Sequence, residues 1–469
     1  MSGEPPALPA RLHPLVRAFL DDRAAVAAVA DSGTPAHVVF PQVLAENADA
    51  LAAVLDRSPV RSRMYYAHKV NRSPALARAA EPCGIGIDVA SPGELANARA
   101  AGFAPARIEV TGPKGARFLA TAVASGATIN VDNLWELAAL DDLARGTDPI
   151  PALLRVGDLP GTPRSRFGVP LPRVDDALRL LAASASRIRF LGFAFHLDSG
   201  AVTDRVRAVQ TCLALIERAH AHGLAPHVLD IGGGLRQVFT ADADRFDGYV
   251  RALRAGLSGR GPAMSWPGQT FGYHVAGGAA HGTPVFHKYG NTVGAADMLA
   301  ELLAAPLAEH EGRPLGTVLA DNLLELWLEP GKALVDHAGL TLASVEFVKE
   351  LGDGTVLVTL DLSRDTVTPA DQEVMVDPLV LPGARRDDGP AVGVYFAGRL
   401  CLERDLITTR QVFLPGLPAP GDVVVFPNTA AYHMDLSAST AARWAPPRRW
   451  VVESTEAGFA ARPDAEAAA

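Results

Sequence analysis

Residues 64–71 have the sequence Met-Tyr-Tyr-Ala-His-Lys-Val-Asn, an apolar and aromatic run that leads to a lysine. Such a run predicts a buried strand, and residues 71–74, Asn-Arg-Ser-Pro, are of the kinds that end strands. Lys69 is therefore expected at the carboxyl end of a strand, where α/β folds bind ligands. A lysine beside apolar side chains loses its proton more easily than in water, and the neutral amine forms imines. A solvated lysine just past a strand is the alternative.

Strand-like runs alternate with helical stretches on both sides of this segment. The eight runs are residues 36–40, 64–70, 84–90, 108–112, 128–132, 152–156, 190–196 and 227–231. Alternation of this kind predicts a parallel sheet. A closed (β/α)8 barrel of the TIM type is favoured over an open α/β sheet, because the count is near eight and no Gly-rich turn dominates early.

The sequence changes character after residue 340. Gly352-Asp353-Gly354 is a turn signal between apolar residues 341–350 and 355–360, and further short strands are separated by Pro and Gly. This pattern predicts a mostly antiparallel C-terminal β-domain. The expected domains are an extension over 1–34 that packs with the β-domain, a barrel over 35–340, and the β-domain over 341–469.

The barrel segment contains an apparent insertion at about residues 236–325. The 94 residues between Gly234 and Glu329 are too many for one barrel unit, and residues 264–291 are rich in Gly, aromatics and His. We interpret the region as an insertion over the barrel mouth that acts as a lid or a partner surface, with a decorative subdomain as the alternative. Because His274, His281 and His287 lack zinc-site spacing, no metal is predicted.

Composition excludes several classes of protein. A net charge of −9 without a basic run argues against a nucleic-acid partner. Residues 1–22 lack the apolar core of a signal peptide, and no apolar stretch approaches the roughly 20 residues that span a bilayer. Three scattered cysteines without a CxxC pair fit a reducing compartment. We therefore expect a cytoplasmic protein with no membrane partner.

Two segments after predicted strands have the features of a cofactor site. Residues 230–234, Asp-Ile-Gly-Gly-Gly, allow backbone N–H groups to approach a phosphate at the end of a barrel strand. In residues 195–200, Phe-His-Leu-Asp-Ser-Gly, His196 is suited to stack on an aromatic ring and Ser199 to bind a phosphate. A glycine-rich loop, a buried histidine and a helix-capping serine are the alternatives.

Three more residues are candidates for chemistry. Glu329 follows the apolar residues 326–328, and an inward carboxylate is costly unless it is paired, for example with a protonated pyridine nitrogen. Cys401 lies between apolar and charged residues, and Tyr432 follows small residues that allow close approach to a ligand. The alternatives are a surface turn, a packing cysteine and a surface tyrosine.

In this order, these motifs resemble those of the pyridoxal-phosphate-dependent ornithine/diaminopimelate/arginine decarboxylase family, the fold type III group that includes alanine racemase. The resemblance runs from Pro35 to Ala438 outside the insertion, so the chain looks like a divergent member with a large insertion. It implies pyridoxal 5′-phosphate as the cofactor. The cofactor-binding residues that it implies are Lys69, Asp88, His196, Ser199, Gly232, Gly233, Gly234, Glu329 and Tyr432.

The resemblance also implies a mechanism and an assembly. Lys69 would hold the cofactor as an imine, with His196 stacked on the ring, and the amine of an amino-acid substrate would displace it. After decarboxylation, Cys401 is the candidate proton donor. In this family the active sites are shared across a homodimer and the cysteine comes from the partner subunit. Arg166 could then pair with Asp405 across the interface.

Departures from the family pattern concern the substrate. Lys332 replaces the usual Arg after Glu-Pro-Gly, Asp198 replaces the usual Gly beside Ser199, and Leu402 stands where an acidic residue often reads a distal amine. The candidate substrate-binding residues are Asp361, Asp405 and Lys332. We expect decarboxylation of a non-standard or specialised amino acid. The alternatives are an amino-acid racemase on the same fold and a catalytically silent homologue.

Overall fold

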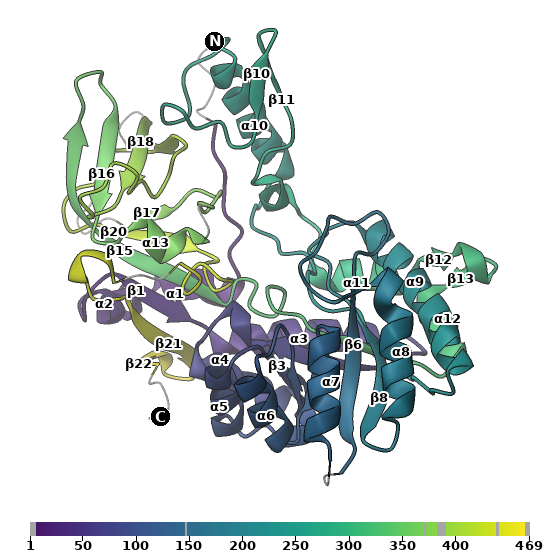
Figure 1. The fold of residues 1–469 in the computed structure, drawn as a ribbon. Helices are drawn as coiled ribbons and strands as arrows, with labels where there is room; N and C mark the ends of the chain where they lie inside the picture. Colours follow the sequence, from purple (N-terminus) through teal and green to yellow (C-terminus); the bar gives the residue numbers. More distant parts are fainter. Residues whose placement is uncertain (1–5, 146–147, 370–371, 382–390, 438–439, 465–469) are drawn as a thin grey trace. The chain divides into compact units, whose positions relative to one another are not determined.

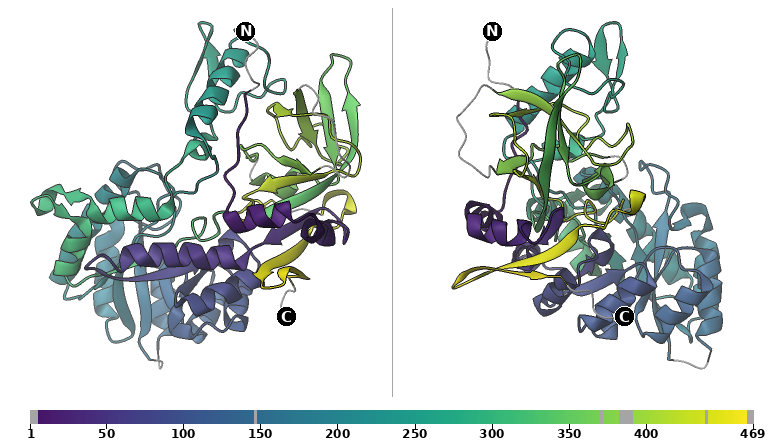
Figure 2. Two further views of the ribbon diagram at one scale, coloured as in Figure 1. Left: turned by 180° about the vertical axis from the view of Figure 1, so that it is seen from behind. Right: turned by 90° about the vertical axis from the view of Figure 1, so that its left-hand side faces the viewer.

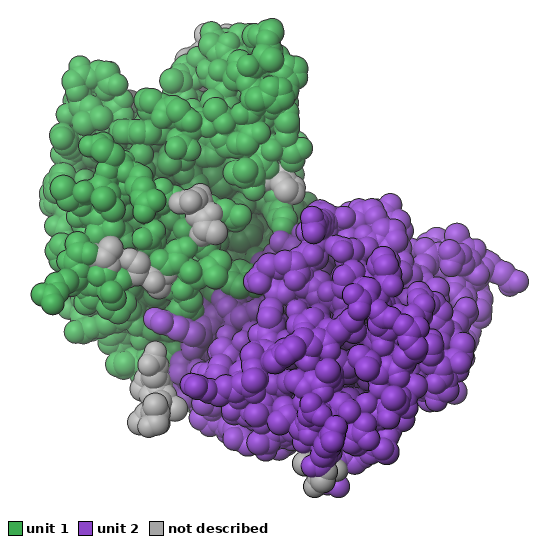
Figure 3. All heavy atoms as spheres, in the orientation of Figure 1, with its two compact units in different colours: residues 1–43, 237–293, 335–465 green, residues 44–236, 294–334, 466–469 purple. Residues whose placement is uncertain are grey.

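The computed structural model describes residues 6–145, 148–369, 372–381, 391–437 and 440–464. The chain forms two compact units, each built from segments that are far apart in the sequence (Figure 3). The β-unit comprises Met1–Val43, Gln237–Val293 and Val335–Ala465, and the barrel unit comprises Leu44–Arg236 and Gly294–Leu334.

The barrel unit is a closed ring of eight parallel strands, as the sequence predicts. In ring order they are β2 (Arg61–Ala67), β3 (Gly86–Val89), β4 (Ile108–Val110), β5 (Thr128–Val131), β6 (Ile150–Gly157), β8 (Ile188–Ala194), β9 (Val228–Asp230) and β14 (Glu325–Leu328), which pairs with β2. A short strand β7 (Val169–Pro170) pairs with β6. Every residue of β3, β4 and β5 is buried, as expected for parallel strands that helices cover.

Helices follow the barrel strands, and Figure 1 shows α7, α8 and α9 along the outer face of β6 and β8. Three of the helices begin at capping side chains: the side chains of Ser73, Ser91 and Asn133 each accept a backbone N–H of the first turn. None of the described helices is long and apolar enough to cross a membrane. The helices are α3 (Pro41–Leu55), α4 (Pro74–Ala80), α5 (Pro92–Ala100), α6 (Ala116–Ala124), α7 (Leu134–Leu143), α8 (Val174–Ala183), α9 (Val202–Ala221), α11 (Ala295–Ala304) and α12 (Leu315–Asp321).

One predicted barrel strand belongs elsewhere. The run at residues 36–40 forms β1 (Ala36–Val39), but β1 pairs with β15 (Gly339–Glu350) and β21 (Arg448–Thr455) in the β-unit. The place that it was expected to fill in the barrel is taken by β14. The run is apolar and precedes a helix, so its own pattern predicts burial and extension but not its partner. Partners are set by long-range packing, and the prediction that counted this run in the barrel was wrong.

The β-unit contains a nine-stranded, mostly antiparallel sheet. The predicted turn at 352–354 joins β15 to its antiparallel neighbour β16. The N-terminal helices α1 (Pro14–Asp21) and α2 (Arg23–Ala30) lie beside β22 (Gly458–Pro463) in both views of Figure 2. The ring centroids of Phe19 in α1 and Phe459 in β22 are 5.6 Å apart. The remaining strands are β16 (Val356–Leu360), β17 (Leu379–Leu381), β18 (Val392–Ala397), β19 (Val412–Leu414), β20 (Val423–Pro427) and β22 (Gly458–Pro463), with a short helix α13 (Arg364–Val367).

The predicted insertion divides between the two units. Residues 237–293, which we call the inserted segment, contain α10 (Ala243–Leu257) and the hairpin β10 (His274–Ala276)–β11 (Ala279–His281). Their aromatic side chains pack with residues 374–376 of the β-unit. The rest of the region carries α11, the short pair β12 (Pro306–Leu307)–β13 (Arg313–Pro314), and α12 of the barrel unit. The lid role and the predicted domain boundaries stay predictions.

Candidate active site

Lys69 lies at the carboxyl end of β2, as the sequence predicts. A single turn, His68–Val70, follows the strand, and the Nζ atom of Lys69 lies 2.9 Å from Oδ2 of Asp88 at the end of β3. The hydroxyl of Thr111 donates to the other Asp88 oxygen at 2.7 Å. The lysine side chain is 34% exposed, so a carboxylate partner, more than apolar walls, holds the amine. Thr111 was not predicted as a site residue, because a threonine after a strand has no distinctive sequence pattern around it.

The three glycines at 232–234 are required by close backbone contacts. A Cβ atom on Gly233 would lie 2.4 Å from the Glu329 carbonyl oxygen, and one on Gly234 would lie 2.0 Å from that of Leu197. Gly232 and Gly234 also have positive φ angles of 65° and 74°, which other residues adopt only with strain. The absence of side chains therefore lets this loop pack directly against the backbone of Leu197 and Glu329.

Arg205 braces this loop and was not predicted. Its guanidinium is fully buried and donates to the carbonyl oxygens of Leu197 and Gly233, each at 2.7 Å, and of Ile231 at 3.3 Å. Burial lowers the pKa of Arg205 to about 10. Its position in the sequence could have indicated this role, because Arg205 lies on the same face of α9 as the buried Val202, Val209 and Cys212. A cation on an apolar helix face needs internal partners.

His196 lies just after β8, in the loop that also contains Ser199 and leads to α9. Its Nδ1 accepts a hydrogen bond from the N–H of Gly233 at 3.2 Å, so the proton of the neutral ring is on Nε2. Burial, and then the nearby charges of Lys69 and Arg155, lower the pKa of His196 to about 3. A neutral imidazole fixed in this way can stack on an aromatic ring without adding charge.

Glu329 follows β14 and has an unused buried oxygen. Its backbone N–H donates to the Gly232 carbonyl, while the side-chain Oε1 has no hydrogen-bond partner among the described residues. Burial, followed by repulsion from Asp230 and Asp88, raises the pKa of Glu329 well above its usual value. A buried acceptor of this kind suits a cationic N–H group. With the glycine loop beside it, this acceptor fits a phosphorylated pyridine ring such as that of pyridoxal phosphate.

Two departures from the family pattern contact each other. The Nζ atom of Lys332 lies 2.6 Å from Oδ1 of Asp198, and the exposed Asp198 carboxylate therefore offsets the lysine charge. The neighbouring Ser199 hydroxyl donates to the Asp204 carboxylate and accepts the N–H of Ala201 at 3.1 Å. Ser199 thus stabilises the start of α9, and a phosphate contact would require its hydroxyl to change partners.

Cys401 lies in the β-unit on an exposed loop between β18 and β19, with a free thiol. The loop is held by the buried carboxylate of Asp405, which accepts the N–H groups of Arg364 at 2.8 Å and Leu400 at 2.7 Å. Arg166 lies over the ring of Phe167, at 4.0 Å from its centroid, in the barrel unit. A pairing of Asp405 with Arg166 of a second subunit stays a hypothesis.

Asp361 is also engaged within the β-unit. One carboxylate oxygen accepts the hydroxyl of Thr34 at 2.5 Å, and the other accepts the N–H of Ser344 at 2.9 Å. Burial is the main cause of its raised pKa. The substrate contacts predicted for Asp361 and Asp405 would therefore compete with bonds that each carboxylate already makes.

Tyr432 adopts a φ angle of 66° and is followed by a buried histidine, His433. Nδ1 of His433 lies 2.9 Å from the carbonyl oxygen of Val367, which can only accept, so this nitrogen carries the proton. Nε2 is then the acceptor for the hydroxyl of Tyr289, 3.3 Å away. Burial lowers the pKa of His433 to about 4, so the ring is neutral at neutral pH. The inserted segment thereby supports the backbone that presents Tyr432.

The structure thus brings one group of predicted residues together. The barrel unit positions Lys69, Asp88, His196, Glu329 and the glycine loop at the carboxyl ends of its strands. The β-unit carries Cys401, Tyr432, Asp361 and Asp405.

Known proteins share both the sequence and the fold. Residues 44–265 match the family described as pyridoxal-dependent decarboxylase, pyridoxal binding domain. The chain is 34% identical to an uncharacterized protein of Sinorhizobium fredii over 90% of this chain and 89% of that protein. It is 26% identical to a diaminopimelate decarboxylase of Methanothermobacter thermautotrophicus, over 86% of this chain and 83% of that enzyme.

The chain belongs to the pyridoxal-dependent decarboxylase family. A solved diaminopimelate decarboxylase from M. jannaschii, in complex with L-lysine, has the same fold, with a TM-score of 0.70 at 17% identity over 97% of this chain and 94% of that one. Pyridoxal phosphate is accordingly the cofactor of this decarboxylase-family enzyme, and the residues at the barrel mouth fit it.

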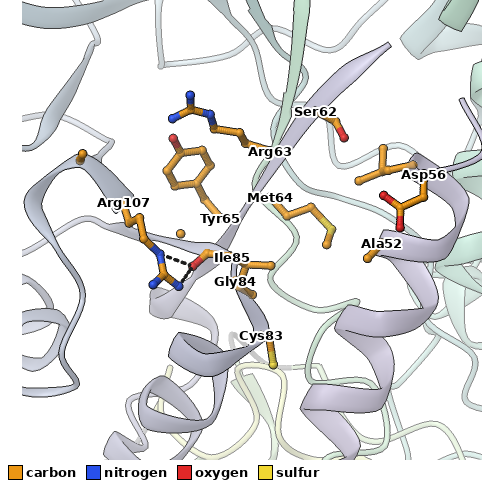
Figure 4. A pocket seen from close by; sticks show the side chains of 13 residues that line it. Ala52, Asp56, Ser62, Arg63, Met64, Tyr65, Cys83, Gly84, Ile85 and Arg107 are labelled. Carbon is orange, nitrogen blue, oxygen red and sulfur yellow. Dashed lines mark hydrogen bonds between the residues drawn. The ribbon is translucent and has the colours of Figure 1, made fainter. Parts of the chain in front are cut away.

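The barrel unit also has a cavity away from its pyridoxal-binding end. A cavity of about 400 Å³ lies at the opposite ends of β2 and β3, where Figure 4 shows Arg107 donating to the Ile85 carbonyl beside Tyr65 and Arg63. Residues at the amino-terminal face of such barrels serve stability, and catalytic residues lie at the carboxyl face. The size of this cavity therefore does not make it the active site.

Replacing Tyr289 with phenylalanine is expected to weaken cofactor binding several-fold and to lower the thermal unfolding midpoint. The change leaves the buried Nε2 of His433 without this donor, which typically costs about 1–3 kcal/mol. Cofactor titration and thermal unfolding measure the two effects. The matched control is Tyr273→Phe in the same inserted segment, whose hydroxyl makes no hydrogen bond to the described residues. Equal behaviour of the two variants would contradict the supporting role.

Proposed function

We propose that this enzyme decarboxylates a non-standard amino acid, with Lys69 as the imine-forming residue and Cys401 as the proton donor. The observation that carries the proposal is the set of residues at one end of the barrel. A lysine paired with Asp88, a neutral His196, a glycine loop and the unused oxygen of Glu329 come from five different strand ends. Together they match what a pyridoxal phosphate decarboxylase needs.

Each of these residues has a separate role. Bound pyridoxal phosphate supplies an electron sink for the electron pair that remains when carbon dioxide leaves. Glu329 would keep a proton on the ring nitrogen, and the neutral His196 would pack on the ring face. The N–H of Gly234 would bind the phosphate, because those of Gly232 and Gly233 donate to Asp230 and His196. Asp88 orients the amine of Lys69.

We infer the substrate class from the residues that would contact the side chain of the substrate. Leu402 is apolar, and the oxygens of Asp361 and Asp405 are bonded to groups of the β-unit. A distal amine, as in the diaminopimelate or ornithine named for its relatives, would therefore find no free carboxylate at these three positions. These contacts support an amino acid without a second amine at the end of its side chain.

Purified enzyme should release carbon dioxide from one amino acid in a panel of diamino, aromatic, aliphatic and acidic compounds. The panel should include both stereoisomers of each. Release only from ornithine, arginine or diaminopimelate would contradict the proposal that the substrate is a non-standard amino acid. Exchange of the α-hydrogen without carbon dioxide release would indicate a racemase, and no cofactor uptake would indicate a silent homologue.

The proposal includes a homodimer in which each active site takes Cys401 from the partner subunit. The exposed thiol on a braced loop supports this, because a donor held rigidly at the surface can enter a second subunit. Mixing inactive Lys69→Ala and Cys401→Ala proteins should restore up to about a quarter of the sites, since half of the dimers are mixed and each has one intact site. No recovery after subunit exchange would contradict sharing.

Replacing Asp198 with asparagine is expected to tighten cofactor binding about three- to tenfold at low salt. The change frees Lys332 from its ion pair and removes a negative charge beside the phosphate loop. Titration with pyridoxal phosphate at two salt concentrations measures the effect. The control Asp176→Asn removes an exposed carboxylate on α8 that pairs with Arg173 and Arg179. An equal change in both variants would mean that only net charge matters.

A further inference from the structure

Three buried carboxyl groups meet inside the barrel, and the proposed function uses only one of them. Glu109 comes from β4, Asp230 from β9, and Glu329 follows β14. One oxygen of each lies within 4.8 Å of the others, and all three side chains are buried. Barrel interiors of this type are ordinarily filled by branched apolar side chains. Glu109 and Asp230 therefore need an explanation of their own.

The carboxyl groups lack enough partners for three negative charges. Asn130 donates to Oε1 of Glu109 at 2.9 Å, and the N–H of Gly232 donates to Oδ1 of Asp230 at 2.7 Å. Glu109 Oε2, Asp230 Oδ2 and Glu329 Oε1 have no hydrogen-bond partner in the described part of the chain. Nor does any described lysine or arginine form an ion pair with the three groups; Lys69 pairs instead with Asp88.

Like charges at this spacing cannot all ionise in a buried site. Burial, followed by repulsion from the neighbouring carboxylates, raises the pKa of Glu109 well above its usual value. Burial, together with repulsion from Asp88, raises the pKa of Asp230 to about 7. The cluster therefore retains protons at neutral pH.

We propose that Glu109 and Asp230 share a proton behind Glu329, and that Glu109 is a positioning residue of the cofactor site. One proton between Glu109 Oε2 and Asp230 Oδ2 joins two unpartnered acceptors in a hydrogen bond. The pair then carries one negative charge next to Glu329. This inference rests on the proposed function in one respect, that Glu329 faces the ring nitrogen of the cofactor.

The shared charge affects the ring nitrogen through Glu329. A negative charge behind Glu329 makes its carboxylate more basic and favours a cation at the nitrogen that it contacts. The ring nitrogen therefore stays protonated to higher pH than Glu329 alone would allow. Glu109→Gln leaves one negative charge on Asp230, and replacing both residues with their amides, Glu109→Gln/Asp230→Asn, removes the charge while the Glu329 contact is kept.

The first test uses cofactor-free protein, with thermal unfolding midpoints measured from pH 5 to 8. The folded protein retains protons that unfolded carboxyls have lost above pH about 4, so its stability falls as pH rises through about 7. Each retained proton changes the folding equilibrium about tenfold per pH unit. Glu109→Gln supplies a fixed N–H donor to Asp230, and Glu109→Leu removes the neighbour. Glu109→Gln should show a flatter dependence on pH, whereas in Glu109→Leu the buried Asp230 keeps its proton and the wild-type dependence should remain. Equal slopes in wild type and Glu109→Gln would overturn the shared proton.

The second test follows the absorption of bound pyridoxal phosphate with pH. In Glu109→Gln/Asp230→Asn the ring nitrogen should lose its proton about one pH unit lower, so kcat should fall about tenfold at pH 8.5 and less at pH 6.5. The control Glu109→Gln keeps one negative charge on Asp230 and should titrate as wild type does. A merely structural role would change kcat equally at both pH values. Wild-type protein that takes up no cofactor would overturn the proposed function and with it this role. Equal titrations of loaded wild type and the double variant would overturn the role of the Glu109–Asp230 pair alone.

Discussion

Replacement of Lys69 by alanine is expected to remove the visible absorption band of bound pyridoxal phosphate and to lower kcat by at least about 10³-fold. Lys69 is the amine at the carboxyl end of β2, and its Nζ lies 2.9 Å from the Asp88 carboxylate. Alanine offers neither the imine nor the ion pair. Absorption spectra of the loaded protein and carbon dioxide release measure the loss.

Lys69→Arg separates the two roles of this side chain. Arginine can keep the charge opposite Asp88 but does not form the imine, since its guanidinium stays protonated. We therefore expect the absorption band and activity to be lost in both variants. The cofactor-free thermal midpoint should stay nearer to that of wild type in Lys69→Arg. Appreciable turnover by either variant would contradict the assignment of Lys69.

The second large effect is expected from Gly234→Ala. The new Cβ atom would lie 2.0 Å from the Leu197 carbonyl oxygen and 2.8 Å from a guanidinium nitrogen of Arg205, at a φ angle of 74°. The left-handed backbone costs alanine about 1 kcal/mol, and relief of the contacts must move the loop. Cofactor affinity should fall by about 100-fold or more, because the loop N–H groups lose their placement.

The matched control for this change is Gly93→Ala. Gly93 lies in α5, and a Cβ atom there meets nothing within 4 Å. Alanine should stabilise the helix by about 0.5–1 kcal/mol and leave cofactor binding unchanged. Thermal unfolding and cofactor titration compare the two variants. Equal cofactor affinity in both would mean that the glycine loop does not hold the phosphate.

Local pattern was enough to predict much of the fold. Most of the barrel strands are short apolar runs, and such runs predict both burial and an extended conformation. Several helices between them begin at a capping serine or asparagine, which predicts where those helices start. The position of Lys69 at a strand end follows from residues 64–74 alone. The glycines at 232–234 also carry a local signal, since their conformations and contacts exclude a side chain.

Other features depend on which segments meet. The apolar run at β1 joins the β-unit, and β14 closes the barrel, because a buried strand does not encode its partner. Arg205 braces the glycine loop, and Lys332 pairs with Asp198 more than a hundred residues away. Glu109 is a single acidic residue in an apolar run, with no signal until β4 and β9 bring it to Asp230.

The sequence by itself determined most of the helices and strands, the position of Lys69 at the end of a strand, and the loop at 232–234 that only glycine can form. Those properties depend on backbone conformation and burial, which neighbouring residues impose. The tertiary structure alone decided the charge environment behind Glu329 and the ion pair of Asp198. Electrostatic interactions act between groups that are close in space, and the chain order of Glu109, Asp230 and Glu329 does not reveal their approach to within 4.8 Å.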